Sequence, residues 1–222
     1  MLAVPMYLSV SFVLITALTV YLFSRCYRFP AIFWWSLLLW MLFQVGLVSS
    51  GFYQNFTAIP PRFPLLFVPT LFVMLYFLLS QKGQQIIDRF SLAQLTILHT
   101  IRIPVELVLY GLFIEKAIPE IMTFAGRNWD ILAGLTAPVV YYFMFVKKTM
   151  SRRSLLIWNV LSLLLVLNIV IHAILSAPSP FQQFGLDQPN IAIFHFPFVW
   201  LPSVVVPLVI FAHLVAIRRL IR

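Results

Sequence analysis

The sequence contains little charge, few acidic residues and a single cysteine. Only 9% of its 222 residues are charged, Asp and Glu together number 6, and 62% of the chain is hydrophobic. This excludes an ordinary soluble domain, in which about 25% of the residues are charged. The lone Cys26 excludes an intrachain disulfide and a metal site built from cysteines. The composition therefore predicts an integral membrane protein, with the lipid bilayer as its partner.

The shortage of acidic residues leaves a formal net charge of +9. A protein that binds nucleic acid gathers its basic residues on one solvated surface. Here Lys and Arg fall instead in short clusters between long apolar runs. We therefore expect no nucleic-acid partner, and we interpret the clusters as signals that orient the chain in a membrane.

A helix needs about 20 mostly apolar residues to cross the hydrocarbon core of a bilayer, and seven segments meet this requirement. They lie at roughly 2–23, 31–50, 64–80, 92–114, 130–147, 154–176 and 197–217. The connections between them are short and leave no room for a soluble domain. The sequence thus predicts an all-α polytopic membrane protein, with a single transmembrane domain over 1–222 that forms a seven-transmembrane-helix bundle.

The basic residues predict the orientation, because Lys and Arg are retained on the cytoplasmic side. Eleven of them fall on one side of the predicted bundle, in alternate connections and at the C-terminus. The opposite side carries only Arg62, Lys116 and Arg127, and Arg102 lies inside a span. We expect the N-terminus outside and the C-terminus in the cytoplasm, in a plasma membrane or a bacterial inner membrane.

Two known kinds of membrane protein are excluded by what the spans lack. A retinal protein with seven helices needs a lysine in the last span for its Schiff base, and residues 197–217 contain none. The His and Asp patterns of membrane-bound zinc hydrolases and a glycine-rich phosphate loop are also missing from the sequence. The sequence therefore predicts no metal site and identifies no catalytic residue.

The fourth predicted span carries an unusual stripe of polar residues. At 100° per residue, Arg102, Glu106 and Tyr110 lie within about 60° of His99 on one face of the helix. The remaining faces are apolar, so this stripe should point into the bundle. Arg102 and Glu106 are four residues apart, which allows a salt bridge along the helix that removes the net charge. We expect Arg102 to contact either Glu106 or a polar residue on a neighbouring span.

Proline and glycine predict how this span is shaped and packed. Pro104 has no N–H and crowds the carbonyl of Thr100, so we expect a kink there. In the fifth span, Gly134 and Ala137 form a small face that permits close approach of another helix, and we expect that helix to be the fourth span.

Charged residues also gather in the connection that follows the fourth span on the outer side. These residues are Glu115, Lys116, Glu120, Arg127 and Asp130. Asn128 or Asp130 is well placed to cap the fifth helix. Because the polar stripe continues outward into this connection, we expect an internal site between mid-depth and the outer surface, open to the outside. The predicted binding residues are His99, Arg102, Glu106, Tyr110, Glu120, Arg127, His172 and His195.

This pattern favours a transporter or carrier of a small solute, and the buried ionisable residues would allow it to be proton-linked. An alternative is a membrane-embedded enzyme that acts on a lipid. In that case Glu106 or Glu120 would be the acid or base, His172 or His195 would stand beside it, and Arg127 would hold a lipid head group.

Two further alternatives remain open. A b-type haem protein would use the histidines as axial pairs, with His99 and His213 in the cytoplasmic half and His172 and His195 near the outer surface. A structural subunit without a site would use the ion pair and the kink only to fix how the fourth helix packs. Outside the haem alternative, we expect no cofactor.

Overall fold

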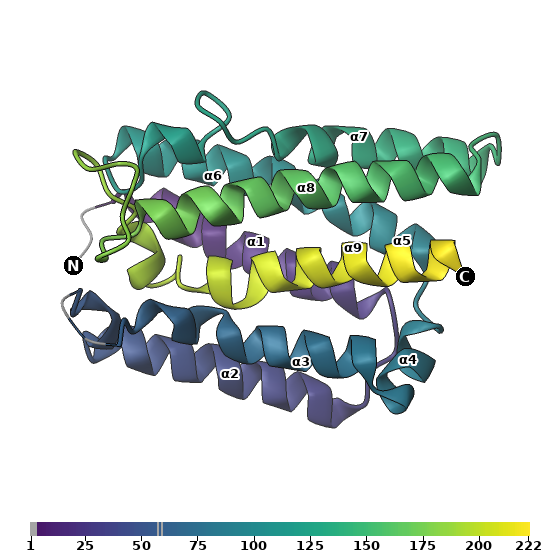
Figure 1. Ribbon diagram of the computed structural model, residues 1–222, viewed down its shortest axis with the longest axis horizontal. Helices are drawn as coiled ribbons and strands as arrows, with labels where there is room; N and C mark the ends of the chain where they lie inside the picture. The colour runs from purple at the N-terminus through teal and green to yellow at the C-terminus, as the bar shows by residue number, and fades with distance from the viewer. Residues whose placement is uncertain (1–3, 57, 59) are drawn as a thin grey trace.

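The structure is a computed structural model that describes residues 4–56, 58 and 60–222. Every regular element in these ranges is helical, and they contain no strand, so the all-α prediction is confirmed. The longer helices run along the long axis of the molecule (Figure 1). They are α1 (Met6–Ser24), α2 (Ala31–Ser49), α3 (Val68–Leu79), α6 (Arg102–Ile114), α7 (Ile131–Tyr141), α8 (Arg152–Ser176) and α9 (Val206–Ile221).

Shorter elements connect or extend these helices. They are η1 (Phe52–Gln54), η2 (Phe63–Leu66), α4 (Gln81–Ile87), α5 (Leu92–Leu98), η3 (His99–Ile101), η4 (Glu120–Met122), η5 (Tyr142–Val146), η6 (Ala192–Phe194) and η7 (Leu201–Val205). Two of them are π-helical segments: η5 continues the α7 helix, and η7 directly precedes the α9 helix.

Five helical segments of the described chain are long and apolar enough to cross a membrane. They are Met6–Ser24, Ala31–Ser49, Leu92–Ile114, Arg152–Ser176 and Leu201–Ile221. Two further apolar helices, Val68–Leu79 and Ile131–Val146, are shorter. Each of the seven segments overlaps one of the spans expected from the sequence, although residues 2–3 of the first expected span lie outside the described residues.

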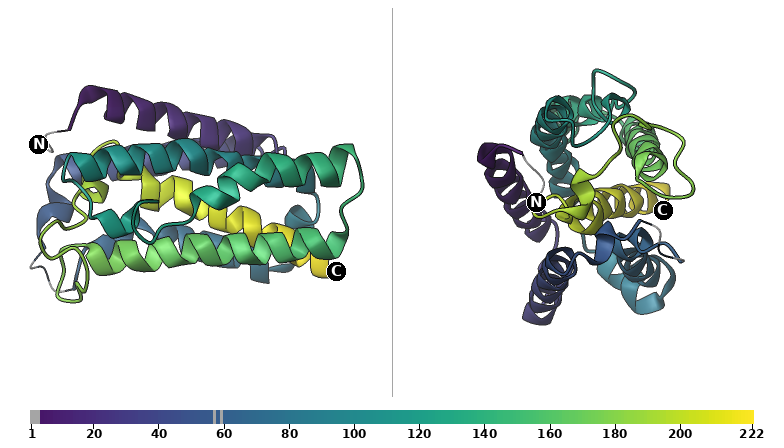
Figure 2. Two further views of the ribbon diagram at one scale, coloured as in Figure 1. Left: turned by 90° about the horizontal axis from the view of Figure 1, so that it is seen from above. Right: turned by 90° about the vertical axis from the view of Figure 1, so that its left-hand side faces the viewer.

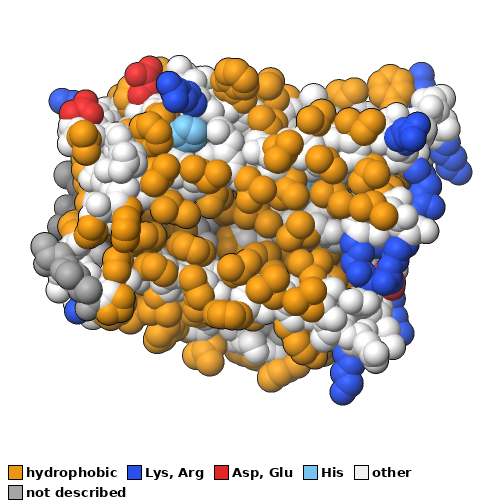
Figure 3. Space-filling view, in the orientation of Figure 1, with side chains coloured by type: hydrophobic (Ala, Val, Ile, Leu, Met, Phe, Trp, Pro, Cys, Tyr) orange, Lys and Arg blue, Asp and Glu red, His pale blue; other side chains and the backbone are white. Residues whose placement is uncertain are grey.

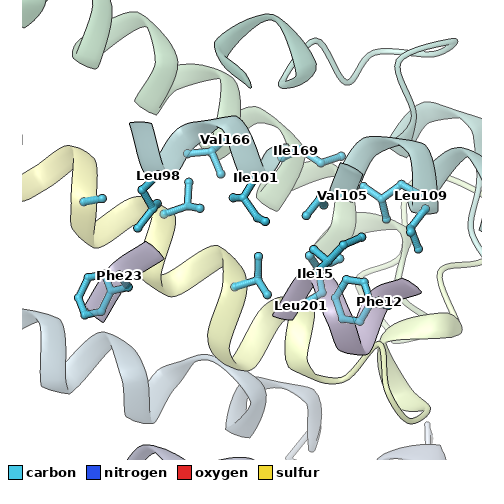
Figure 4. Packing of buried hydrophobic residues seen from close by; sticks show 14 of the residues in the cluster. Phe12, Ile15, Phe23, Leu98, Ile101, Val105, Leu109, Val166, Ile169 and Leu201 are labelled. Carbon is cyan, nitrogen blue, oxygen red and sulfur yellow. The ribbon is translucent and has the colours of Figure 1, made fainter. Parts of the chain in front are cut away.

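The main hydrophobic core lies where α1, the segment from α5 to α6, α8, η7 and α9 meet. Phe12 on α1, Ile101 on η3, Val105 on α6 and Val166 on α8 are all buried there (Figure 4). This contact places the polar face of α6 toward α7, α8 and α9, because its apolar face is occupied by α1.

Pro104 interrupts the fourth predicted span, as expected. The span consists of α5, the 3₁₀ turn η3 and α6, and the turn ends three residues before Pro104. Proline cannot donate to the carbonyl four residues earlier, and a tighter turn is a common response to that loss. The result is a helix whose two halves are joined at the depth of His99.

The close packing expected of the fifth span is also present. A Cβ atom at Gly134 would lie 2.9 Å from Cγ1 of Ile103 and 3.2 Å from Cβ of Arg102. The missing side chain of Gly134 therefore lets α7 approach α6 closely. This approach brings the start of α7 next to Arg102.

The α2 and α3 helices pack more loosely than the rest. Only Gln44 and Val48 of α2 are buried, and none of the side chains of α3, all of which are described, is buried. Seen from the end, the two helices lie to one side of α9 (Figure 2). The indole N–H of Trp40 donates to the carbonyl of Ser203 over 3.0 Å, which ties α2 to η7.

Candidate functional site

Arg102 is the centre of a buried polar cluster between α6, α7, α8 and α9. Only 2% of its side chain is exposed, and its Nη1 lies 3.0 Å from Oδ1 of Asp130. The same Nη1 donates to the carbonyl of Ser162 over 3.2 Å, and Nη2 lies 2.7 Å from Nε2 of His213. These contacts tie three neighbouring helices to α6 through one guanidinium.

Arg102 therefore contacts polar residues of neighbouring helices, which is the second of the two expected outcomes, and not Glu106 on its own helix. Among the described residues, the ion pair of Arg102 is with Asp130, and Glu106 is not within ion-pair distance of it. Sequence spacing within one helix could not anticipate this, because the competing carboxylate comes from the start of α7. Asp130 occupies the N-cap position of α7, one of the two positions expected for the cap, but its side chain makes no capping hydrogen bond there.

Asn128 holds the second buried carboxylate. Its side-chain amide donates to Oε1 of Glu106 over 2.6 Å and to the carbonyl of Met122 over 3.0 Å. Its Oδ1 accepts from the backbone N–H of Asp130 over 3.1 Å. Asn128 thus fixes both acidic residues from one position. Oε2 of Glu106 is buried and has no hydrogen-bond partner among the described residues.

Two histidines lie on the other side of Arg102. The rings of His99 and His213 stack with their centroids 3.7 Å apart and their planes within 7°. Nδ1 of His213 lies 2.9 Å from Oδ1 of Asn159. Because that oxygen only accepts and Arg102 only donates, His213 is the neutral tautomer that carries its proton on Nδ1.

This arrangement does not fit the haem alternative for these two histidines. Axial ligands present one nitrogen each to an iron that lies between them. Here the rings stack face to face, and both nitrogens of His213 are already engaged, by Asn159 and Arg102. The two nitrogens of His99 are buried without a hydrogen-bond partner among the described residues.

A cavity of about 270 Å³ reaches the acidic side of the cluster. Glu106 and Asp130 line it, and they are the charged residues of its wall. The rest of the lining is mainly apolar side chains from α3, α6, α8, η7 and α9. Leu71 on α3 and Leu167 on α8 both line the cavity and are exposed. The cavity therefore reaches the lateral face of the molecule between α3 and α8, whereas the sequence predicts an opening toward the outside.

That lateral face is apolar. Figure 3 shows hydrophobic side chains covering the middle of the molecule, with Lys and Arg gathered mainly at the end where the C-terminus lies. A molecule that enters the cavity from this face must therefore have an apolar part.

A second cavity of about 260 Å³ lies on the opposite side of α3. Aromatic side chains dominate its lining, among them Phe23, Trp40 and Phe211. Thr70 and Met74 of α3 line both cavities. The α3 helix is therefore a thin partition with free volume on each side, which agrees with its lack of buried side chains.

Five of the predicted site residues lie away from the polar cluster. Glu120 and Arg127 are exposed in the connection before α7, and Tyr110 is exposed on α6. His172 and His195 are half-buried, and each bonds through Nδ1 to a backbone carbonyl four residues earlier. Only His99, Arg102 and Glu106 of the predicted set belong to the cluster.

Sequence reasoning missed the cluster residues that come from other helices. These are Asn128, Asp130, Asn159, Ser162 and His213. A signal was present for two of them, because Asn128 and Asp130 stand two apart directly before a span whose small residues predict close contact with the fourth span. His213 was matched to His99 by its similar depth in the bilayer, but only within the haem alternative.

The chain belongs to a family described as a domain of unknown function (DUF8737), which matches residues 60–221. The matched region contains every residue of the polar cluster and of the cavity that Glu106 lines. No curated protein and no solved structure matches the chain. Family membership therefore supplies no activity, and function has to be argued from the cluster and the cavity.

Proposed function

We propose that the protein is a multi-pass integral membrane protein with seven transmembrane helices, its N-terminus outside and its C-terminus in the cytoplasm. The apolar helices and the large hydrophobic side chains on their outer faces support this proposal. Leu14, Leu39, Phe72, Leu135 and Ile171 come from five different helices and are all more than half exposed. Such surfaces are unfavourable in water and favourable in lipid.

Within that bilayer, the function that we propose is carriage of a small molecule that has an apolar part. The observation that carries the proposal is the cavity of about 270 Å³, which is mainly apolar along its walls, reaches the lateral face and has Glu106 in its lining. A solute that is polar throughout would leave this lining without partners. A molecule with an apolar part can enter between α3 and α8 and bring its polar group to Glu106.

The loose packing of α3 supports a carrier over a static binding protein. Cavities flank α3 on both sides, so a shift of this helix would close one volume while opening the other. The cluster around Arg102, in contrast, is held by α6, α7, α8 and α9 together. A site held by several helices, beside a helix with free volume on both of its sides, suits alternating access. Proton coupling would act through Glu106, whose carboxylate needs either a proton or a partner at this depth.

An enzyme that acts on a lipid is the second candidate, and one observation favours it. Oε2 of Glu106 has no partner among the described residues, while Oε1 is held by Asn128 at 2.6 Å. A carboxylate fixed at one oxygen and free at the other has the geometry of a general base. The lateral opening would admit one chain of a lipid from the bilayer.

One preparation separates the two candidates. Purified protein in proteoliposomes is assayed for uptake of labelled amphipathic molecules and for turnover of labelled lipid, with Glu106→Gln as the test variant. We expect uptake by the unaltered protein, its loss in the variant and no lipid turnover in either. Lipid turnover that depends on Glu106 would favour the enzyme over the carrier. The absence of both uptake and lipid turnover would favour a structural subunit.

A matched control is available on the same helix. Tyr110 lies one turn beyond Glu106 but is exposed and outside the cavity. Tyr110→Phe should therefore leave uptake unchanged. Equal loss in both variants would mean that the assay reports damage to α6 rather than the cavity.

A further inference from the structure

The two charged residues that line the Glu106 cavity are both acidic. They are Glu106 from α6 and Asp130 from the start of α7, and each side chain is less than 10% exposed. Arg102, the nearest cation, is not part of the lining and lies behind Asp130. The charged groups in the wall of the cavity are therefore negative.

The contacts of these carboxylates are unequal. Asp130 has a cationic partner, because its Oδ1 lies 3.0 Å from Nη1 of Arg102. Glu106 has only a neutral donor, the side-chain amide of Asn128, and its Oε2 has no partner among the described residues. The other ionisable groups of the cluster, His99 and His213, lie on the far side of Arg102. The cluster thus has one guanidinium for two carboxylates, and the carboxylate without a cationic partner is that of Glu106.

A buried carboxylate without a cation is unfavourable unless it binds a proton or receives a positively charged donor. Glu106 is 2% exposed, so water does not supply that donor from bulk solvent. The apolar walls of the cavity cannot supply it either. The unmatched position in the wall of the cavity is therefore complementary to a cation that arrives with a ligand.

We propose that the ligand of this cavity is a cationic amphiphile, with an amine or ammonium head beside Glu106 and a single apolar chain that leaves between Leu71 and Leu167. This inference rests on the proposed function, since it names the class of molecule that the carrier takes. The volume of about 270 Å³ is at the lower end for small-molecule sites, which fits one chain and a small head better than a two-chain lipid.

A series of three probes with the same chain tests the proposal. Dodecylamine, dodecanol and dodecanoate are titrated calorimetrically at pH 7 into nanodiscs that hold the full-length protein, and empty nanodiscs give the background. A hydrogen bond to a charged group contributes about 1.5–3 kcal/mol, so we expect the amine to bind roughly 10- to 100-fold more tightly than the alcohol. The carboxylate should bind most weakly, because it meets Glu106 and Asp130.

Variants test the contributions of the head group and of the apolar chain to binding separately. Glu106→Gln should reduce binding of the amine to the level of the alcohol. Leu71→Trp, at the mouth of the cavity, should weaken all three probes, whereas Phe72→Trp, on the exposed face of α3 outside the cavity, should weaken none. The comparison of the three probes on the unaltered protein does not depend on the folding of any variant.

The outcomes distinguish this inference from the proposed function. Equal binding of all three probes, lost in Leu71→Trp, would overturn the cationic ligand while leaving the lateral cavity as a binding site. Tighter binding of the carboxylate would overturn the cationic ligand in the same way. No binding of any probe above the empty nanodiscs would overturn both proposals.

Discussion

At the residue scale, the buried pair of Arg102 and Asp130 makes a quantitative stability prediction. Asp130→Asn leaves the guanidinium without its anionic partner in a site that is 2% exposed. Removal of one member of a buried ion pair costs about 3–5 kcal/mol. We expect Asp130→Asn to lower the unfolding free energy in detergent by that amount, measured by chemical denaturation.

Asp187→Asn is the matched control for this variant. Asp187 is exposed in the connection after α8, so the same chemical change there should alter the unfolding free energy by less than about 0.5 kcal/mol. Replacing both members of the pair, as in Arg102→Met with Asp130→Leu, should recover part of the loss, because it leaves no buried charge. Equal destabilisation by both single Asp→Asn variants would contradict the assignment of the pair.

The thiol of Cys26 gives a prediction that depends on pH. Burial raises the pKa of Cys26 from 9.0 to about 12. A protonated, buried thiol reacts slowly, so maleimide labelling at pH 8 should be slow in the folded protein and fast after unfolding in dodecyl sulfate. Above pH 9 the thiol ionises in the unfolded chain but stays protonated in the folded one, so the unfolded state gains stability. The contribution of Cys26 to folding stability is therefore complete below pH 9 and is lost as the pH rises toward 12. Cys26→Ala should remove this part of the loss of stability at alkaline pH. Rapid maleimide labelling of the folded protein would contradict the prediction, because it would show that the thiol is accessible.

At the scale of elements, the contact between α7 and α6 depends on Gly134. A methyl group at this position would lie 2.9 Å from Cγ1 of Ile103 and 3.1 Å from its backbone nitrogen. The backbone atom cannot move aside easily, so Gly134→Ala should destabilise the protein by about 1–3 kcal/mol through overpacking. It should also shift Asp130 away from Arg102, because both partners depend on this approach.

Gly46, in the last turn of α2, is the control for Gly134. A Cβ atom there would meet nothing within 4 Å. Gly46→Ala should therefore be neutral or should stabilise α2 by up to about 1 kcal/mol, since alanine favours a helix. Thermal unfolding of the two variants in the same detergent makes the comparison, and a larger loss in Gly46→Ala would contradict the packing described for α7.

Elements were more predictable from the sequence than the partners of side chains. Apolar runs, Pro104 and Gly134 each report a local property of the chain, and they predicted the helices, the interruption of the fourth span and its close contact with the fifth. The partner of Arg102 is not local. Glu106 and Asp130 are both acidic residues within reach of it, and the choice between them depends on the path of the connection before α7. The exposure of Glu120 and Arg127 depends on that same path, which no periodicity in the sequence encodes.

At the scale of the whole molecule, the distribution of basic residues predicts the topology. Met150 lies between η5 and α8, beside the basic residues Lys147, Lys148, Arg152 and Arg153. Gly185 lies between α8 and η6, in a connection that contains Asp187 and no Lys or Arg. Because α8 is 25 residues long and separates the two positions, they should lie on opposite sides of the bilayer.

Reporter fusions measure this directly. A reporter that is active only in the cytoplasm should be active when fused after residue 150 and after Arg222, and inactive when fused after residue 185. A reporter that is active only outside should give the reverse pattern. If the fusions at 150 and 185 report the same side, α8 does not cross the membrane. The lateral face between α3 and α8 would then not lie against lipid, and the route by which we propose that an amphiphile reaches Glu106 would be lost.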